Sequence, residues 1–105
     1  MRNKKYKLQK LEKNRFSLFT DNLEYCIVCG MPSQEINEVF PGRNRQNSMK
    51  YGMCIPLCSR CHKKYHIDRD MQLYYMQIGK EIFLSNYSEQ EWDNSFRYIK
   101  TRFYS

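Results

Sequence analysis

The sequence predicts a small α+β domain in which two short strands are followed by helices. The first observation is a matching pair of Cys-x-x-Cys motifs, Cys26-x-x-Cys29 and Cys58-x-x-Cys61, which enclose two short apolar runs. The second is that helical periodicity with capping residues dominates after the second motif. The length of 105 residues suits one domain. We therefore expect a single domain with a basic N-terminal arm (1–20), a ββα core (21–67) and a C-terminal helical hairpin (68–105).

A basic segment opens the chain. Residues 1–16 contain seven Lys or Arg residues and a single acidic residue, Glu12. Leu8 and Leu11 lie on a loosely helical stripe, which predicts a short basic helix or arm. The residues fit two interpretations about equally well: a solvated leader, or an arm that contacts DNA phosphates.

Two short apolar runs predict an antiparallel pair of strands. Residues 36–40 alternate apolar and polar side chains, and residues 53–57 are apolar throughout. Pro41-Gly42 predicts a turn after the first strand, and the polar segment 43–52 is expected to be a connection. Pro56 has no N–H to donate, so it indicates an edge position or a strand end.

Three helices are expected after the strands. Ser59 can N-cap a helix that runs to residue 66, and Asp68 or Asp70 can cap a second one. Ser88 and Glu91 have the spacing of a capping box for a last helix. Apolar side chains expected on that last helix are Trp92, Phe96, Ile99 and Phe103.

The cysteines predict one structural zinc ion. Zinc in structural sites takes four tetrahedral ligands, and each Cys-x-x-Cys turn supplies two thiolates, here Cys26, Cys29, Cys58 and Cys61. Gly30 follows the first motif, where a positive φ lets backbone amides face the sulfur atoms. Five free buried cysteines would be an odd outcome for so regular a spacing. The fifth cysteine, Cys54, lies outside both motifs and is expected to be a small buried hydrophobe.

His62 and His66, the chain's two histidines, follow the second motif at positions i and i+4 of the predicted helix. This spacing places both imidazoles on one helical face, where they could share a metal ion. Because Cys58 and Cys61 are committed to zinc, that ion would be a second one. The alternative is that His62 replaces a cysteine in the zinc shell.

With these residues the chain resembles small phage and prophage proteins of the HNH, or His-Me finger, endonuclease type, and the resemblance covers nearly the whole chain. It implies a ββα-metal core that a zinc ion staples, with Mg²⁺ or Mn²⁺ on the reactive face. The segments that carry it are Lys13–Ser17, Thr20-Asp21, Cys26-x-x-Cys29-Gly30, Val39-Phe40-x-Gly42-Arg43-Asn44-Arg45, Ser48-x-Lys50-Tyr51-Gly52, Ile55–Cys58, Cys61-His62 and the tail after Met71.

The resemblance also implies roles for individual residues. A histidine at the end of the first strand would activate water, and one metal ion would stabilise the phosphate undergoing attack. The base and an adjacent ligand fall on Asn37 and Glu38, while His62 and His66 match the helix-borne metal ligands. Asn44 matches the middle residue of the HNH motif only loosely.

The chain departs from this pattern at the position of the general base. Relatives of this type typically have His-His or His-Glu where this sequence has Asn37-Glu38. Asn37 can still offer an oxygen to a metal ion, and Glu38 or His62 could act as the base. General-base catalysis contributes about 10²–10⁴-fold, so we expect cleavage to be strongly impaired. The alternative is a non-catalytic module that binds nucleic acid.

Charge favours DNA as the partner. The net charge is +7, and aromatic residues make up 15% of the chain. No apolar run is long enough to span a membrane and no apolar segment follows the first lysines, so we expect a cytoplasmic protein of the bacterial host cell. The residues expected to contact DNA are Lys4, Lys5, Lys7, Arg15, Arg43, Arg45, Lys50, Lys63 and Lys64.

Aromatic residues after position 73 suggest a further alternative, a host protein that this chain binds. Tyrosine and tryptophan are enriched at protein interfaces. A helical hairpin of this size also needs such side chains for its own core, and we favour that interpretation. The residues concerned are Tyr74, Tyr75, Tyr87, Trp92, Tyr98, Phe103 and Tyr104.

Overall fold

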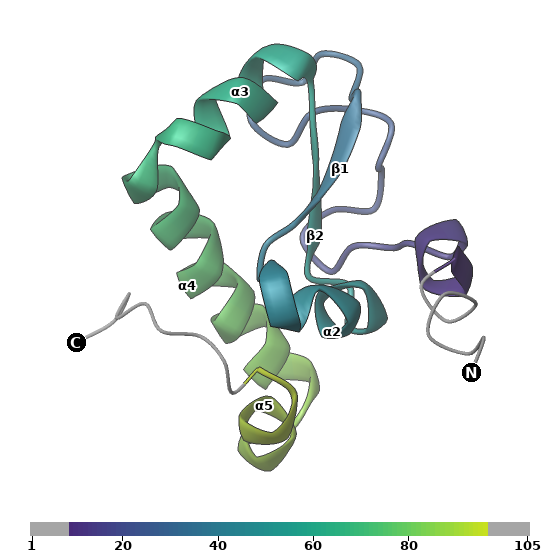
Figure 1. The fold of residues 1–105 in the computed structure, drawn as a ribbon, viewed down its shortest axis with the longest axis vertical. Helices are drawn as coiled ribbons and strands as arrows, with labels where there is room; N and C mark the ends of the chain where they lie inside the picture. The colour runs from purple at the N-terminus through teal and green to yellow at the C-terminus, as the bar shows by residue number, and fades with distance from the viewer. Residues whose placement is uncertain (1–8, 97–105) are drawn as a thin grey trace.

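A two-stranded antiparallel sheet lies between helices in the computed structural model, which describes residues 9–96 (Figure 1). Strand β1 (Glu35–Glu38) pairs with β2 (Cys54–Leu57), with Glu35 opposite Leu57 and Glu38 opposite Cys54. The predicted strand pair is confirmed, although β1 ends before residues 39 and 40. Together with the helices below, the sheet makes this part of the chain an α+β domain.

The two faces of this hairpin carry different side chains. Residues directly opposite in an antiparallel pair share a face, so Asn37 lies with Ile55 and Glu38 lies with Cys54. Ile55 belongs to the buried core together with Tyr65 of α3 (Ser59–Ile67). Asn37 therefore lies on the face that the C-terminal helices cover, and Glu38 lies on the other.

The polar connection expected over residues 43–52 is helical, which was not predicted from the sequence. It contains a 3₁₀ turn, η1 (Gly42–Asn44), and a short helix, α2 (Arg45–Lys50). The buried Ser48 hydroxyl accepts a hydrogen bond from the Phe40 N–H at 3.1 Å and donates one to the Phe40 carbonyl at 2.7 Å. Because a helix this short is unstable alone, these tertiary bonds hold it in place.

Side-chain caps begin the three helices that follow. Cys58, and not the predicted Ser59, caps α3, because the Cys58 thiol accepts the N–H of Cys61. Asp68 caps α4 (Arg69–Asn86) through a 3.0 Å bond from the N–H of Met71. The hydroxyl of Ser88 caps α5 (Glu89–Ser95) in the predicted manner. The predicted positions Ile99 and Phe103 lie outside the described residues.

Aromatic rings form the core beneath α4 and α5. Phe83 is fully buried, and its ring centroid lies 5.4 Å from that of Trp92 and 5.1 Å from that of Tyr51. Trp92 is likewise buried, as expected for a residue that serves the core. Tyr74 is exposed, and Tyr98, Phe103 and Tyr104 lie outside the described residues.

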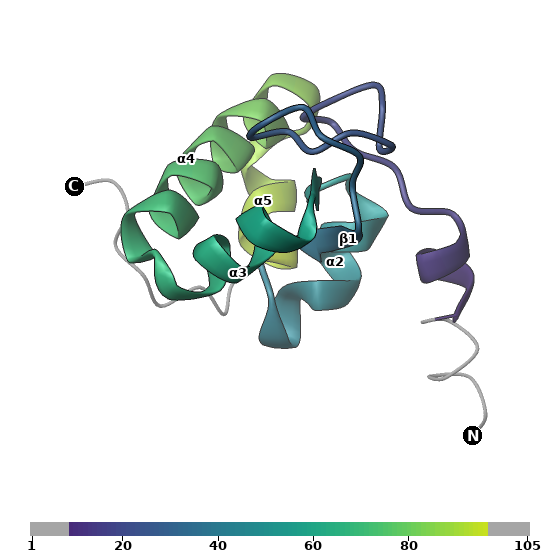
Figure 2. The same ribbon diagram turned by 90° about the horizontal axis from the view of Figure 1, so that it is seen from above.

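The N-terminal segment begins on the far side of the hairpin from α4 (Figures 1 and 2) and reaches α4 at Phe19, whose ring centroid lies 6.2 Å from that of Tyr75. Residues 9–13 are helical, and both views place them across the hairpin from α4 (Figures 1 and 2). Further on, the Leu18 N–H donates to the Gly52 carbonyl at 2.8 Å, and the Ser17 hydroxyl donates to the Cys54 carbonyl at 2.6 Å. None of the helices between residues 9 and 96 is long and apolar enough to cross a membrane.

Candidate metal centre

The four cysteines of the two motifs converge on one point. The sulfur atoms of Cys26, Cys29, Cys58 and Cys61 all lie within 4.8 Å of one another, and those of Cys29 and Cys58 are 3.6 Å apart. Tetrahedral zinc with Zn–S bonds of about 2.3 Å requires sulfur atoms about 3.8 Å apart. The cluster therefore has the donor set and the spacing of a structural zinc site.

The first motif forms a tight turn docked on the sheet. Gly30 has a φ of 80°, as predicted, and its N–H donates to the Cys26 carbonyl at 2.9 Å. The Ile27 N–H donates to the carbonyl of Pro56 at 2.9 Å, which ties the turn to β2. The turn is thus positioned by the strand that leads directly to the second pair of cysteines.

The second motif uses the start of α3. Cys58 ends the strand segment and caps the helix, and one helical turn later Cys61 faces the same cluster. The first N–H groups of a helix lack partners inside the helix and stabilise negative charge nearby. The start of α3 therefore favours a thiolate at Cys58 even before a metal binds.

The thiols of the cluster differ in acidity. Burial opposes ionisation of Cys26, but backbone hydrogen bonds, the strongest from Cys58, outweigh it and lower its pKa to about 6. A hydrogen bond from the backbone of Cys61 lowers the pKa of Cys58. Burial and the neighbouring thiols raise the pKa of Cys61 to about 12. Four thiolates thus need a bound cation, and a sulfur-binding dication such as Zn²⁺ fits.

Cys54 takes no part in this cluster. It is fully buried, its Sγ lies 3.8 Å from the Ser48 carbonyl oxygen, and burial raises its pKa to about 12. The prediction that it is a small buried hydrophobe is confirmed. Its separation from the other four cysteines makes it a natural control for experiments on the metal site.

The two histidines face each other on α3. His62 Nε2 and His66 Nε2 are 3.0 Å apart, and the ring planes are nearly perpendicular at 77°. Within residues 9–96 the four cysteines are the one group of three or more His, Cys, Asp or Glu side chains close enough to share a metal ion. The zinc cluster is therefore complete without His62, and the role of the histidine pair as metal ligands stays a prediction.

Asn37 and Glu38 point in opposite directions, because successive residues of a strand alternate. The Asn37 side-chain amide donates to the carbonyl of Glu38 at 3.2 Å. Glu38 itself is held between two arginines: Arg15 donates to Oε2 at 2.5 Å and Arg45 donates to Oε1 at 3.2 Å. Their roles in catalysis stay predictions, but the structure places the two side chains in different surroundings.

The predicted DNA-contacting residues also divide into groups. Arg15 and Arg45 are engaged with Glu38, and Arg45 also pairs with Glu12. Lys63 and Lys64 are exposed on α3, while the amine of Lys50 lies 5.2 Å from the ring centroid of Tyr51. Arg43 is exposed, and Lys4, Lys5 and Lys7 lie outside the described residues.

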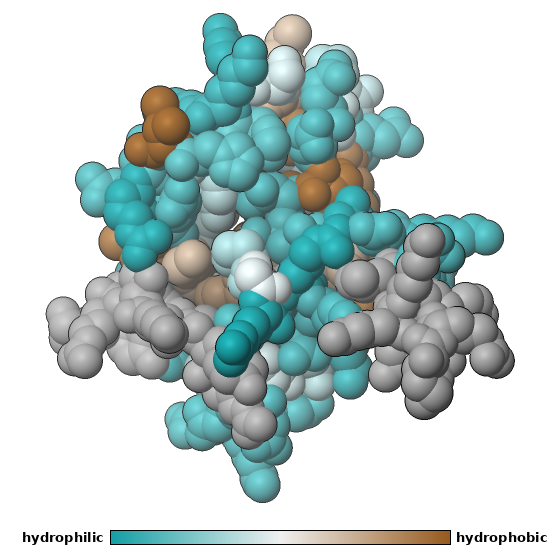
Figure 3. Space-filling view, viewed as in Figure 1, coloured by the Kyte–Doolittle hydropathy of each residue, from teal (hydrophilic) through white to brown (hydrophobic). Residues whose placement is uncertain are grey.

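Charge is distributed unevenly along the chain, a feature the motif-based prediction missed. Residues 39–67 contain six Lys or Arg residues and no acidic residue, whereas acidic residues outnumber basic ones in 68–96. Arg60, exposed on α3 beside Lys63 and Lys64, belongs to this basic stretch. Counting charges by segment would have found it. The face seen in Figure 3 is largely hydrophilic, with separate small hydrophobic spots.

Comparisons of this chain with known protein families, with curated proteins and with solved structures gave no match.

Proposed function

We propose that this chain is an HNH-type protein of phage or prophage origin that binds DNA through its basic residues, with metal-dependent phosphodiester cleavage impaired. The sequence resemblance supplies the family, and the zinc-type cluster with its ββα arrangement is compatible with it. The observation that carries the impaired cleavage is the position of Glu38, whose two carboxylate oxygens each accept a hydrogen bond from an arginine.

Glu38 is poorly placed to act as the general base. A base must have a free lone pair within hydrogen-bond reach of the attacking water. Each oxygen of Glu38 already accepts a hydrogen bond from an arginine, and the side chain is only 13% exposed, which limits the access of an attacking water molecule. It also lies on the face of the hairpin opposite to Asn37, so it does not join the histidines of α3. A carboxylate so arranged does not replace the missing histidine.

Binding to DNA is supported by the basic stretch 39–67. On α3, Arg60, Lys63 and Lys64 are exposed, and no acidic residue of this stretch competes for them. Lysine and arginine bind DNA mainly by neutralising phosphates and releasing counterions, a contribution that does not depend on base sequence. The proposed binding is therefore dominated by the DNA backbone and weakens as salt rises.

A salt titration tests this function. The association constant for a short DNA duplex is measured by fluorescence anisotropy at several salt concentrations. We expect its logarithm to fall linearly with the logarithm of the salt concentration, with a slope of about −0.9 for each phosphate contact. The Lys63→Gln/Lys64→Gln double variant should flatten the slope. Lys80→Gln, which removes a charge from the acidic C-terminal half, is the control and should change it little. Affinity independent of salt, or unaltered in the double variant, would refute DNA binding through this surface.

Cleavage is the second candidate, favoured by one specific observation. His62 Nε2 and His66 Nε2 are close enough to bind one ion, and Asn37 lies on the sheet face that packs with α3. These three residues would hold the predicted divalent metal. Bound there, Mg²⁺ or Mn²⁺ would act as a Lewis acid toward a phosphodiester. Mn²⁺ accepts imidazole ligands more readily than Mg²⁺ does.

Relaxation of supercoiled plasmid in the presence of Mn²⁺ separates the two candidates. We expect weak or no relaxation by the natural chain, and more by Asn37→His, which restores an imidazole on the α3 side. His66→Ala should remove any relaxation that occurs. Efficient relaxation by the natural chain that His66→Ala abolishes would establish the nuclease and refute impairment.

A further inference from the structure

We infer that Arg15 and Arg45 form a phosphate-binding fork, and that Glu38 occupies this fork as an internal competitor while DNA is absent. The inference rests on the proposed DNA binding and goes beyond it, because it names the groups that receive a backbone phosphate. It also gives Glu38 a role other than catalysis, which is to lower the affinity of the free protein for polyanions.

The geometry of the three side chains is the first argument. Arg15 follows the helical residues 9–13, Arg45 opens α2, and both reach the same carboxylate at the end of β1. Each Glu38 oxygen receives a donor from a different guanidinium, Oε2 at 2.5 Å and Oε1 at 3.2 Å. A phosphodiester presents two non-bridging oxygens in a similar way, and guanidinium groups suit carboxylate and phosphate alike.

Unused capacity at the fork is the second argument. The Nε atom of Arg15 is buried and has no hydrogen-bond partner. Leaving a buried donor of a charged group unpaired costs free energy, so Glu38 satisfies this site incompletely. A tetrahedral phosphodiester presents its oxygens in a different arrangement from a planar carboxylate, so it can pair with donors that Glu38 leaves unpaired.

Exchange is feasible because the cluster lies partly at the surface. The Arg45 side chain is 34% exposed, and its second partner, Glu12, is 42% exposed. The Arg45–Glu12 ion pair is exposed enough to contribute little net stability, so an incoming phosphate can reach the fork from the Arg45 side; Arg15 and Glu38 are less exposed, at 23% and 13%. The two arginines and the two glutamates together carry no net charge. The fork therefore attracts anions only weakly until one of the glutamate side chains moves away from its arginine. The hydrogen bond from Arg45 lowers the pKa of Glu12, so Glu12 stays charged near neutral pH.

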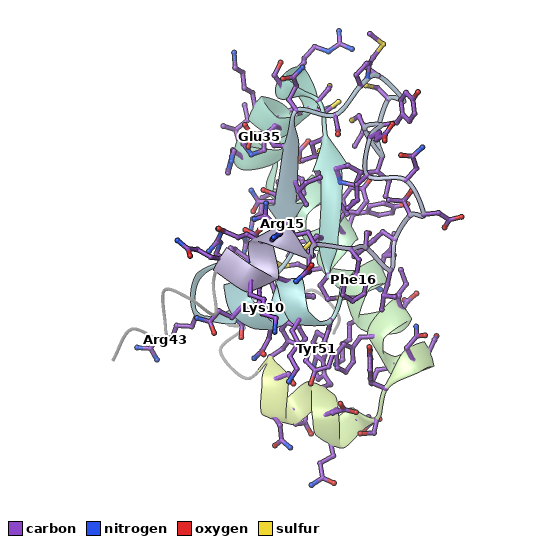
Figure 4. All side chains as sticks on the ribbon, turned by 90° about the vertical axis from the view of Figure 1, so that its right-hand side faces the viewer. Lys10, Arg15, Phe16, Glu35, Arg43 and Tyr51 are labelled. Carbon is purple, nitrogen blue, oxygen red and sulfur yellow. The ribbon has the colours of Figure 1, made fainter. Side chains whose placement is uncertain are left out.

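Neutralising Glu38 tests the inference, with Glu35 as the matched control. Glu38→Gln keeps the side-chain size and frees the fork. Glu35→Gln makes the same chemical change on the same strand, and Figure 4 shows Glu35 toward the α3 end of the hairpin and Arg15 farther along it. Both variants add one unit to the net charge, so a difference between them reports the fork alone. The readout is the affinity for a short DNA duplex and its salt dependence.

Glu38→Gln is expected to bind about two- to fivefold tighter than Glu35→Gln, a change that corresponds to about 0.4–1 kcal/mol of binding free energy. Its log–log salt slope should be steeper by about 0.9 for each phosphate gained. Adding Arg45→Gln to Glu38→Gln should abolish the difference. Equal affinities and slopes for Glu38→Gln and Glu35→Gln would overturn the inference while leaving salt-dependent binding by the natural chain intact. If neither variant nor the natural chain binds, the proposed function fails as well.

A merely structural role for the ion pairs gives a different result. In that case Glu38→Gln lowers the melting temperature and changes neither affinity nor salt slope. Should Glu38→Gln fail to fold, Glu12→Gln takes its place, because it frees Nη2 of Arg45 from a more exposed partner. A folded Glu12→Gln whose salt slope equals that of Glu35→Gln would likewise overturn the inference.

Discussion

Removing one cysteine of the cluster is the most direct test of how this chain is held together. Cys29 is the exposed member of the four, so its replacement by alanine removes a metal ligand and leaves the core packing nearly unchanged. We expect Cys29→Ala to lose zinc and to unfold far more easily than the natural chain. The natural chain is expected to carry one zinc ion.

The magnitude follows from the loop that the zinc would close. A cross-link between Cys26 and Cys58 closes a loop of about 33 residues, which in the chain-entropy treatment corresponds to about 3.7 kcal/mol of unfolding free energy. Small domains have a net stability of only about 5–15 kcal/mol. For a domain of this size the loss would lower the melting temperature by roughly 15–30 °C.

Thermal melts followed by circular dichroism, with zinc content measured on the same samples, would check this. Cys54→Ala is the matched control, because Cys54 is a cysteine buried outside the cluster. It should lose some stability through the cavity it creates but keep its zinc. Equal zinc content in the two variants, or a melting temperature that a strong chelator does not change, would show that the cluster is not a structural zinc site.

Two further predictions concern the buried residues. Because burial raises the pKa of Cys54 to about 12, its thiolate fraction at about pH 8 is near 10⁻⁴. Iodoacetamide should therefore label Cys54 only when the protein unfolds. Labelling as fast as that of a free thiol, measured by mass spectrometry, would refute this. Its raised pKa stabilises the fold below about pH 8.5, and this contribution is lost as pH rises toward 12. Phe83→Ala should lower the unfolding free energy by about 3–5 kcal/mol in denaturant titrations, whereas Tyr74→Ala, an exposed ring on the same helix, should change it by about 0.5 kcal/mol or less.

Features set by local chemistry could be predicted from the sequence. A Cys-x-x-Cys turn fixes two sulfur atoms by covalent geometry, so two such turns around a strand pair predict the cluster. Asp68 and Ser88 cap their helices because a short polar side chain can reach an N–H three residues on. The antiparallel pairing of the two apolar segments also follows from their apolar pattern and from their short separation in the sequence.

Features set by contacts distant in sequence could not be predicted. Helix α2 has a polar sequence without helical periodicity, and it depends on hydrogen bonds between Ser48 and Phe40. The cap of α3 at Cys58 is a local contact, in which the sulfur accepts the N–H of Cys61, but it was missed because oxygen-bearing side chains such as that of Ser59 are the usual N-caps. Arg15 and Glu38 form an ion pair although they are 23 positions apart in the sequence, and no local pattern predicts that pairing.

The structure changes the question that Asn37-Glu38 poses. In the sequence, Asn37-Glu38 is treated as a single motif that either contains the general base of the HNH type or lacks it. On a strand they cannot act together, because alternation sends Asn37 to the face of α3 and Glu38 to the arginines. A histidine at position 37 would lie on the face of the hairpin that the C-terminal helices cover, whereas a histidine at position 38 would lie between Arg15 and Arg45 and break their ion pairs. Asn37 and the arginine-bound carboxylate of Glu38 are therefore separate features, and each is tested without the other, through Asn37→His and Glu38→Gln.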